Sequence, residues 1–230
     1  AYAGATALGC GTLAIASLAN GGQPSAIGAS PSAAGNLILG PGTLRYTGAA
    51  AETDRGFTLD AGSTKAAIID TDADVTFGGT VAASSGAFIK KGTGTLKLTG
   101  TGAMYLSRPG SQNYNLYAEW PSNGDSPSVS FPGFLIAEGK MVWGAEGQSV
   151  FLPGIESWVG GWTTAVPGGE TAGELEILGG YTRFDYFLVI GRNNGNASRS
   201  PTPLRPKVTV RGGTVSVNSI ILNYDSSLSQ

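Results

Sequence analysis

Three aspartates at alternate positions, Asp70, Asp72 and Asp74, form the pattern in this sequence with the clearest chemical potential. On a strand they would share one face, and in a loop they could converge on a calcium ion, which prefers oxygen ligands. The calcium-loop pattern also requires a glycine after the third acid and a distal glutamate, whereas this sequence has Val75 and no matching glutamate. We therefore expect no metal site and no cofactor, with calcium binding by the three aspartates as the alternative.

A second stretch with chemical potential runs from Lys90 to Gly102 and has the sequence KKGTGTLKLTGTG. Glycines beside lysines suggest a phosphate-binding loop. However, the order G-x-x-x-x-G-K-[ST] is absent, and Lys97 stands where G-x-G-x-x-G needs its third glycine. No helical pattern follows whose N-terminal amides could bind phosphate. We therefore expect Lys90, Lys91 and Lys97 to be solvent-facing residues at the edge of a coil.

The residues needed for common catalytic mechanisms are largely missing. Without a histidine, the sequence cannot supply Ser-His-Asp or Cys-His catalysis, histidine metal sites or the commonest general base at neutral pH. It also lacks the G-x-S-x-G motif of a serine nucleophile. The single cysteine, Cys10, directly precedes a strand-like run, where we expect a buried and inert thiol. The sequence therefore predicts no catalytic residues and no enzymatic activity.

The tryptophans lie in the middle of the chain, where a sugar-stacking platform or a partner-binding patch could form. Trp143 occupies an inward position of the repeat described below, and we expect it to pack in the core. Trp158 and Trp162 lie in the glycine-rich stretch WVGGW, and both core packing and binding remain open for them. The other members of this aromatic group are Trp120, Tyr114 and Tyr117.

The composition limits the possible partners. The net charge is −2, and the basic residues are scattered, which argues against nucleic acid because that partner needs a basic stripe. No apolar run approaches the roughly 20 residues that span a bilayer. Only 13% of the residues are charged, whereas glycine occurs 37 times, and this excess indicates very many turns. The chain begins at Ala1, so we expect a mature product or an excised fragment.

A short glycine-led pattern recurs along the chain at irregular spacing. Each copy is a glycine, a polar residue, and then an apolar, a variable and a second apolar residue. The copies begin at Gly11, Gly42, Gly94, Gly139, Gly173 and Gly213. Side chains alternate across a strand, so the apolar pairs should point inward, as in Leu13 and Ile15, Leu44 and Tyr46, Leu96 and Leu98, and Val215 and Val217. The variable residues include both charges, which indicates exposure, and they are Ala14, Arg45, Lys97, Val142, Glu176 and Ser216.

Other strand-like runs fill the gaps between the copies, and no long segment has a helical period of apolar residues. Many short strands with glycine turns indicate a sandwich, a barrel or a solenoid. Recurrence along the whole chain favours a solenoid in which the copies are successive rungs of a single ladder.

Three stretches resemble a known repeat: residues 2–30, residues 31–59 and FIKKGTGTLKLTGTG of residues 88–102. They are similar to the autotransporter-associated β-strand repeat of bacterial surface and secreted proteins. The stretches LEILGGYTRFDYFLVIGRNNGN and KVTVRGGTVSVNSIILNYD resemble a related glycine-strand repeat. The resemblance implies a right-handed parallel β-helix exposed outside the cell, and it implies no catalytic residues.

We therefore predict an all-β fold, a right-handed parallel β-helix (β-solenoid) forming a single elongated domain with an irregular middle section. Residues 1–106 should form coils like the autotransporter-associated repeat. Residues 107–171 should form a divergent section that contains all four tryptophans, and residues 172–230 should form further solenoid coils.

The predicted function is structural. We expect an extracellular bacterial surface protein whose subunits stack or pack laterally into a filament, tube or layer. The C-terminal run SVNSIILNYD lacks an evident polar cap, and low charge weakens repulsion between copies. One alternative is an adhesin passenger fragment that binds glycans or host surfaces through its tryptophan-rich middle. A second is a calcium-dependent polysaccharide lyase that uses the aspartates with Arg55 or Lys65 as base, which rests on analogy of fold alone.

Overall fold

The structure is built almost entirely from short β-strands. The computed structural model describes residues 1–62, 65–107, 133–154, 156–162, 170–192 and 205–222. Within these residues the chain forms strands β1 to β21 and one short 3-10 helix, η1 (Ala34–Asn36), in agreement with the expected all-β fold. No helix in this part of the chain has the length and apolar character needed to cross a membrane.

The strands form three sheets. Sheet A consists of β1 (Thr6–Leu8), β3 (Leu37–Leu39), β6 (Phe57–Asp60) and β9 (Val81–Ser85). Sheet B contains β2 (Thr12–Ile15), β4 (Thr43–Tyr46), β7 (Ala66–Thr71), β10 (Ala87–Lys91), β13 (Phe134–Ile136), β16 (Glu156–Trp162), β19 (Tyr181–Arg192), β15 (Gln148–Leu152) and β12 (Gly102–Tyr105), with β17 (Glu170–Thr171) beside β16 and β21 (Thr214–Leu222) beside β19. Sheet C consists of β5 (Ala51–Thr53), β8 (Val75–Phe77), β11 (Thr95–Leu98), β14 (Lys140–Trp143), β18 (Glu174–Ile177) and β20 (Lys207–Val210).

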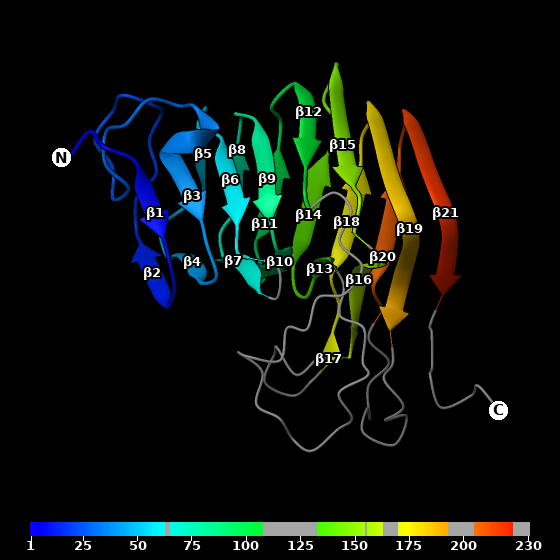
Figure 1. The fold of residues 1–230 in the computed structure, drawn as a ribbon. Coiled ribbons are helices and arrows are strands. Elements are labelled where there is room, and N and C mark those ends of the chain that lie inside the picture. The colour runs from blue at the N-terminus through cyan, green and yellow to red at the C-terminus, as the bar shows by residue number, and fades with distance from the viewer. Residues whose placement is uncertain (63–64, 108–132, 155, 163–169, 193–204, 223–230) are drawn as a thin grey trace.

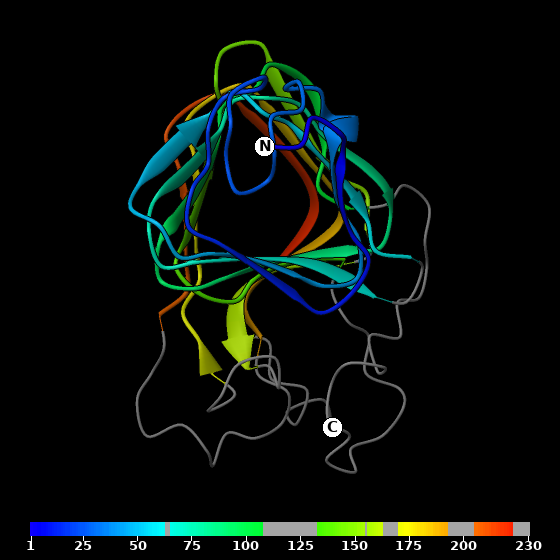
Figure 2. The ribbon, with the colours of Figure 1, turned by 90° about the vertical axis from the view of Figure 1, so that its left-hand side faces the viewer.

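The chain visits the three sheets in turn, so that β6, β7 and β8 form one coil and β9, β10 and β11 form the next. Most strands pair in parallel with the strand one coil later, and Ala66 of β7, for example, lies opposite Ala87 of β10. Figure 1 shows the strands of successive coils side by side, and Figure 2 shows them wrapped around a common interior. Among the described strands, the pairing of β16 with β17 alone is antiparallel. The expectation of parallel sheets is thus confirmed.

One long strand joins two faces in the C-terminal half. β19 pairs through its first residues with β15 and through its later residues with β16. A register shift between Phe184 and Phe187 separates the two parts. Since β15 pairs with β12, which packs beside β9, the first part of β19 continues the face that begins as sheet A.

The interior follows the alternation that the repeat predicts. The core contains Ile15, Leu44, Tyr46, Leu96, Leu98, Met141, Trp143, Leu175 and Ile177 from the glycine-led copies. Leu13, Val215 and Val217 are partly buried against the same core. An aromatic series runs along the axis, with ring centroids 6.1 Å apart for Phe88 and Phe134 and 6.0 Å apart for Phe134 and Trp143. The contact of Phe88 with Phe134 joins neighbouring coils, and the contact of Phe134 with Trp143 joins two faces of one coil.

Two expectations about the repeat are wrong. The copies do not form a single ladder, because β2 and β4 are rungs of sheet B whereas β11, β14 and β18 are rungs of sheet C. This difference explains their irregular spacing along the chain. In addition, the variable residues Val142 and Glu176 are buried rather than exposed. They lie opposite each other across the ladder, and Lys140 and Arg211 form ion pairs over the Glu176 carboxylate.

A second apolar cluster lies on the other side of sheet B. Alternation places Ala67 and Ile69 of β7 in the main core, so Ile68 points to the opposite face. Successive strands continue this row, each residue opposite the one before it: Ile68, Ile89, Leu135, Trp158, Val189 and Ile221. Sheet B is therefore apolar on both faces, as parallel sheets often are.

The glycines of the repeat allow the turns of neighbouring coils to approach closely. A Cβ atom at Gly94 would lie 2.2 Å from the carbonyl oxygen of Ala73, and one at Gly173 would lie 2.1 Å from the carbonyl oxygen of Ile136. Both distances are far below van der Waals contact, and the obstructing atoms belong to the backbone. At Gly94 and Gly173, the glycine is thus required by the close stacking of neighbouring coils.

Replacement of Gly94 by alanine tests this requirement. We expect Gly94→Ala to lower the free energy of unfolding by at least about 2 kcal/mol, because the backbone of the preceding coil must move to admit the methyl group. The matched control is Gly9→Ala, where an added Cβ meets nothing within 4 Å. Chemical denaturation followed by circular dichroism would measure both variants. Equal stability of the two would show that the turns are not in close contact.

Candidate functional site

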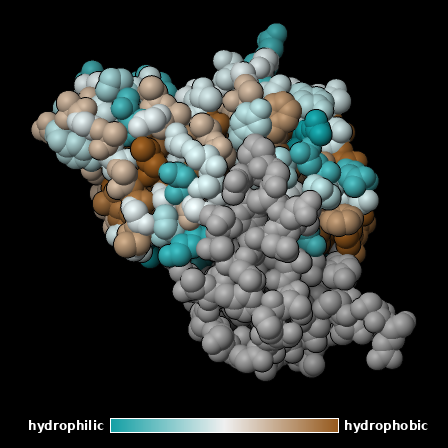
Figure 3. All heavy atoms as spheres, in the orientation of Figure 1, coloured by the Kyte–Doolittle hydropathy of each residue, from teal (hydrophilic) through white to brown (hydrophobic). Residues whose placement is uncertain are grey.

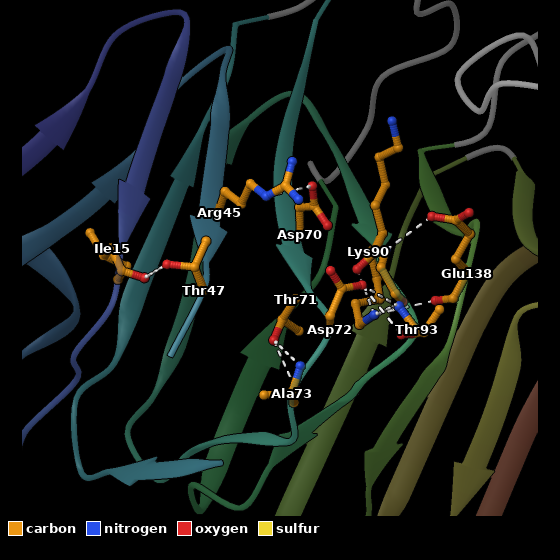
Figure 4. Close-up of polar contacts among 12 residues, drawn as sticks. Ile15, Arg45, Thr47, Asp70, Thr71, Asp72, Ala73, Lys90, Thr93 and Glu138 are labelled. Carbon is orange, nitrogen blue, oxygen red and sulfur yellow. Dashed lines mark hydrogen bonds and ion pairs between the residues drawn. The ribbon is translucent and has the colours of Figure 1, made fainter. Parts of the chain in front are cut away.

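The sequence-predicted acidic and basic residues come together where turns of successive coils stack between sheets B and C. We call this region the B–C corner and define it as residues 70–74, 90–95 and 138–139. Figure 4 shows its side chains on three neighbouring turns, which follow β7, β10 and β13. The corner is polar because turn backbone groups have no strand partner and need side chains to satisfy their hydrogen bonds.

Asp72 and Asp74 each cap the backbone of the next coil. The Oδ1 atom of Asp72 accepts hydrogen bonds from the backbone N–H of Thr93 at 3.1 Å and from its hydroxyl at 3.3 Å. The Oδ1 atom of Asp74 accepts a hydrogen bond from the backbone N–H of Thr95 at 2.9 Å. These backbone hydrogen bonds stabilise the charged carboxylates and hold the pKa of both aspartates below its ordinary value. The two side chains therefore join neighbouring coils.

Asp70 takes a different direction from the other two aspartates. Its Oδ2 atom lies 4.0 Å from Nε of Arg45, on the preceding strand of sheet B. The three carboxylates thus bind three different partners, and the described residues contain no group of three or more histidine, cysteine, aspartate or glutamate residues that could hold a metal ion. The three carboxylates can thus fix the register of the stacked turns.

The expectation that Lys90 faces solvent is wrong. Its side chain is 0% exposed, and its Nζ donates hydrogen bonds to the carbonyl oxygens of Lys91 at 2.6 Å, Gly92 at 2.7 Å and Glu138 at 3.3 Å. Burial lowers the pKa of Lys90 to about 8, although the charges of Asp70 and Glu138 act in the opposite direction. The ammonium group therefore serves as a hydrogen-bond donor to turn carbonyls of two coils. Lys97, by contrast, is exposed as expected, and Lys91 is half-buried.

Arg55 and Lys65 were considered above as the catalytic base of a lyase. Neither residue is fully exposed. Arg55 is 1% exposed, and its guanidinium donates hydrogen bonds to the carbonyl of Ala19 at 2.9 Å, the hydroxyl of Ser30 at 2.9 Å and the carbonyl of Gly28 at 3.1 Å. These contacts fix the N-terminal loops. Lys65 is half-buried and directly precedes β7.

The expectation of a buried thiol at Cys10 is also wrong, because the residue is exposed. The residue lies in the turn between β1 and β2, outside both strands. Residues in such a turn do not follow the inward alternation of the strands that flank it. The expectation of a buried thiol failed for this reason.

The tryptophans divide between core positions and residues outside the described part. Trp143 is buried, as expected, and its indole N–H donates a hydrogen bond to the Thr182 hydroxyl at 3.0 Å. Trp158 is buried in the second apolar cluster, with its indole N–H 2.6 Å from Oε2 of Glu156. Trp162 lies in β16, but its side chain, like Trp120, Tyr114 and Tyr117, falls outside what the structure describes.

Sequence reasoning missed the role of Lys90 and of Glu138, whose Oε2 atom accepts a hydrogen bond from the backbone N–H of Gly92 at 3.1 Å. The only local signal was the position of Lys90, two residues after Phe88 and therefore on the same face of the strand. Lys90 and Glu138 lie on different coils, so their meeting could be recognised only once the register was known.

The stacked parallel strands, glycine-filled turns and capped corners define a repeat protein of coils that pair with one another. No protein-family model matches the chain, and no solved structure matches it. Among curated proteins, the chain is 35% identical over 198 residues to "Adhesin BmaC autotransporter" of Brucella suis biovar 1 (strain 1330). The match covers 86% of this chain and 5% of the adhesin, so the chain spans a small part of its relative's length. The chain is thus related to a stretch of an autotransporter adhesin, which confirms the resemblance to autotransporter passenger-type proteins.

Removal of the Asp74 cap should weaken the corner. We expect Asp74→Ala to lower the free energy of unfolding by about 0.5–1 kcal/mol at neutral pH, because the Thr95 N–H loses a charged acceptor in an exposed turn. The pKa of Asp74 is lower in the folded chain than in the unfolded chain, so this contribution is present at neutral pH and is lost as the pH falls through the folded pKa. The control is Glu52→Ala on the exposed face of β5. Stability curves measured at several pH values would refute the cap if both variants behaved alike.

Lys90 gives a test with the opposite dependence on pH. The unfolded chain keeps this proton up to a pKa of about 10.5, whereas the folded chain releases it near 8. Between these values the unfolded state binds more protons, so raising the pH stabilises the fold through this group by up to about 3 kcal/mol. We expect the stability difference between the native chain and Lys90→Met to grow in favour of the native chain from pH 8 to pH 10. A difference that stays constant over this range would contradict a buried, titrating lysine.

Proposed function

We propose that this chain is a segment of the passenger region of a bacterial cell-surface adhesin, located outside the cell. The observation that carries the proposal is the relationship to an autotransporter adhesin over 86% of this chain. Because the match covers only 5% of that adhesin, the chain would form one stretch of such a passenger. In this proposal it acts by display and binding rather than by catalysis.

We further propose that the coils form a right-handed, three-sided β-helix as one elongated body. The support is the repeated passage through sheets A, B and C, with every coil paired in parallel to the next. Crossover connections between parallel strands of one sheet are almost always right-handed. A body of this kind is stiff along its axis, because backbone pairing and the internal aromatic series both run in that direction. Stiffness suits a stalk that holds a binding surface away from the cell.

The proposed division of the rod follows the sequence. Residues 1–106 and 172–230 provide regular coils, and residues 107–171 provide an elaborated section. In support, strands β13 to β16 from that middle section pair with strands on both sides of it, so the ladder continues through it. The described strands of this section would therefore belong to the same series of coils as those before and after it.

Self-assembly is a second candidate, and a specific observation favours it. The last described coil leaves inward-facing apolar residues uncovered, with Ile220 56% exposed and Leu222 70% exposed. Both lie opposite core-facing residues of β19, namely Leu188 and Ile190. An apolar edge of this kind can pack against a neighbouring coil. In a longer passenger that coil belongs to the same chain, and in a filament it belongs to a second copy.

Surface display tests the adhesin proposal. The chain, fused to a display scaffold on a non-adherent bacterium, should be accessible to antibody on intact cells and should increase the number of cells retained on mammalian cell layers by at least threefold. Cells that carry the scaffold alone are the control. Accessible chain with retention no greater than the control would contradict the adhesin role and leave only a structural one.

The exposed edge gives a separate test of self-assembly. We expect the purified chain to associate in a concentration-dependent manner, and the double variant Ile220→Lys, Leu222→Lys to remain monomeric, because two charges cannot be buried in a stacked apolar edge. Light scattering after size-exclusion chromatography would measure this. Monomeric native chain at millimolar concentration would rule out assembly through this edge.

A further inference from the structure

The outer face of the sheet formed by β12, β15, β19 and β21 carries a small aromatic surface that the functional proposal does not use. Alternation places Met104, Val150 and Phe184 in the interior, so their neighbours in each strand point outward. One outward row consists of Ala103, Ser149, Tyr181 and Thr214, and the next consists of Tyr105, Phe151, Arg183 and Ser216. Figure 3 shows an apolar group over β15 beside strongly hydrophilic groups over β19 on this face.

Three rings of this surface form an aromatic ladder, which we define as Tyr105, Phe151 and Tyr181. Tyr105 is stacked on Phe151 with ring centroids 5.2 Å apart and an interplanar angle of 22°. Phe151 contacts Tyr181 with centroids 6.0 Å apart and an angle of 59°. One face of the Tyr105 ring is therefore covered by Phe151, which holds the ring in a fixed orientation.

No large side chain of a described strand lies beside the other face of Tyr105. The strand on that side is β9, whose outward residues are only Ala82 and Ser84, because Val81 and Ala83 pack against the core. Neither side chain is large enough to cover a tyrosine ring. Tyr105 is accordingly 36% exposed. The ladder thus ends in a flat, pre-oriented aromatic platform.

Polar groups surround the platform without giving it a net charge. The hydroxyl groups of Tyr105 and Tyr181 make no hydrogen bond within the described part of the chain, and a phenolic hydroxyl can both donate and accept one. Arg183 forms an ion pair with Asp185, with Nε and Oδ1 2.5 Å apart, which neutralises its charge while its other N–H groups stay available. A neutral, hydroxyl-rich ligand suits this rim better than an anion.

The size of the surface also selects the ligand. Full burial of an aromatic side chain removes about 150–250 Å² of its surface from solvent. The three rings are already partly buried, so their exposed parts amount to roughly 200 Å² in total. A stable protein interface needs about 800 Å² on each partner, which this ladder cannot supply. One or two sugar rings match the available area. The C–H groups on a pyranose face are attracted by the negative face of an aromatic ring, and hydroxyl groups at the sugar's edge bind polar side chains.

We infer that the aromatic ladder is a binding site for a neutral hexopyranose glycan, with one sugar ring stacked on the open face of Tyr105. Hydrogen bonds from the glycan hydroxyls to the tyrosine hydroxyls and to Arg183 orient the bound sugar. The inference rests on the proposed adhesin function and locates a ligand site for it. Phe151 belongs to the middle section of residues 107–171, but none of the tryptophans of that section is part of the aromatic ladder.

The test uses the full chain and a panel of uncharged hexasaccharides: cellohexaose, chitohexaose, maltohexaose and mannohexaose. Isothermal titration and saturation-transfer NMR would measure binding at low and high salt. We expect at least one hexasaccharide to bind with an affinity that salt does not alter. Tyr105→Ala should weaken this binding at least tenfold, whereas Tyr105→Phe, which keeps the ring, should weaken it less than threefold.

The matched control is Tyr186→Ala, because Tyr186 lies on the same strand as Tyr181 and is 42% exposed but is not part of the ladder. It should bind like the native chain, and circular dichroism should show that all three variants are folded. Absence of binding to every hexasaccharide, or binding that survives Tyr105→Ala, would overturn the inference. Retention of displayed cells is measured independently, so this site could fail while the adhesin proposal stands.

Discussion

Successive coils of this chain are held at the distance of two hydrogen-bonded strands, about 4.8 Å, and this distance constrains every other part of the molecule. Where turns lie directly above one another, as at Gly94 and Gly173, no Cβ atom fits. Where side chains lie above one another, they must be of a kind that tolerates a near-identical neighbour. Flat rings meet this condition, which is why the tilted rings of Phe88 and Phe134 meet in the interior and Tyr105 and Phe151 stack outside.

The same spacing explains how charged groups become part of the fold. The turn carbonyls of neighbouring coils point into the corners without strand partners, and an ammonium or guanidinium group placed among them can satisfy several at once. Lys90 does so between two coils, and Arg55 does so among the N-terminal loops. Carboxylates such as Asp72 perform the complementary task for backbone N–H groups. Residues that suggest a catalytic or metal site in the sequence are thus used to hold the rod together.

Much of the fold could be predicted from the sequence because alternation within a strand is a local property. Leu44 with Tyr46 and Leu96 with Leu98 point inward as the pattern indicates. Assignment of copies to faces could not be predicted, since it depends on the number of residues in each intervening turn. The burial of Lys90 was missed because sheet B is apolar on both sides, so the run AFIKK shows no alternation to reveal which face is the core. The roles of the aspartates depend on register between coils, which a single sequence does not contain.

In the proposed adhesin stalk, which would be anchored at one end and attached at the other, the direction of the hydrogen bonds would have a mechanical consequence. Strands run across the long axis, so the bonds between coils lie along it, and tension applied to the ends pulls them apart in series. The rod should yield by unpeeling one coil at a time. The coil from Ala66 to Ala87 would then lengthen from one strand spacing to about 70 Å. In the proposed adhesin, such release of stored length would absorb a sudden load before the attachment itself breaks. β19, which is bonded on two faces at once, marks the point at which unpeeling would meet the most resistance.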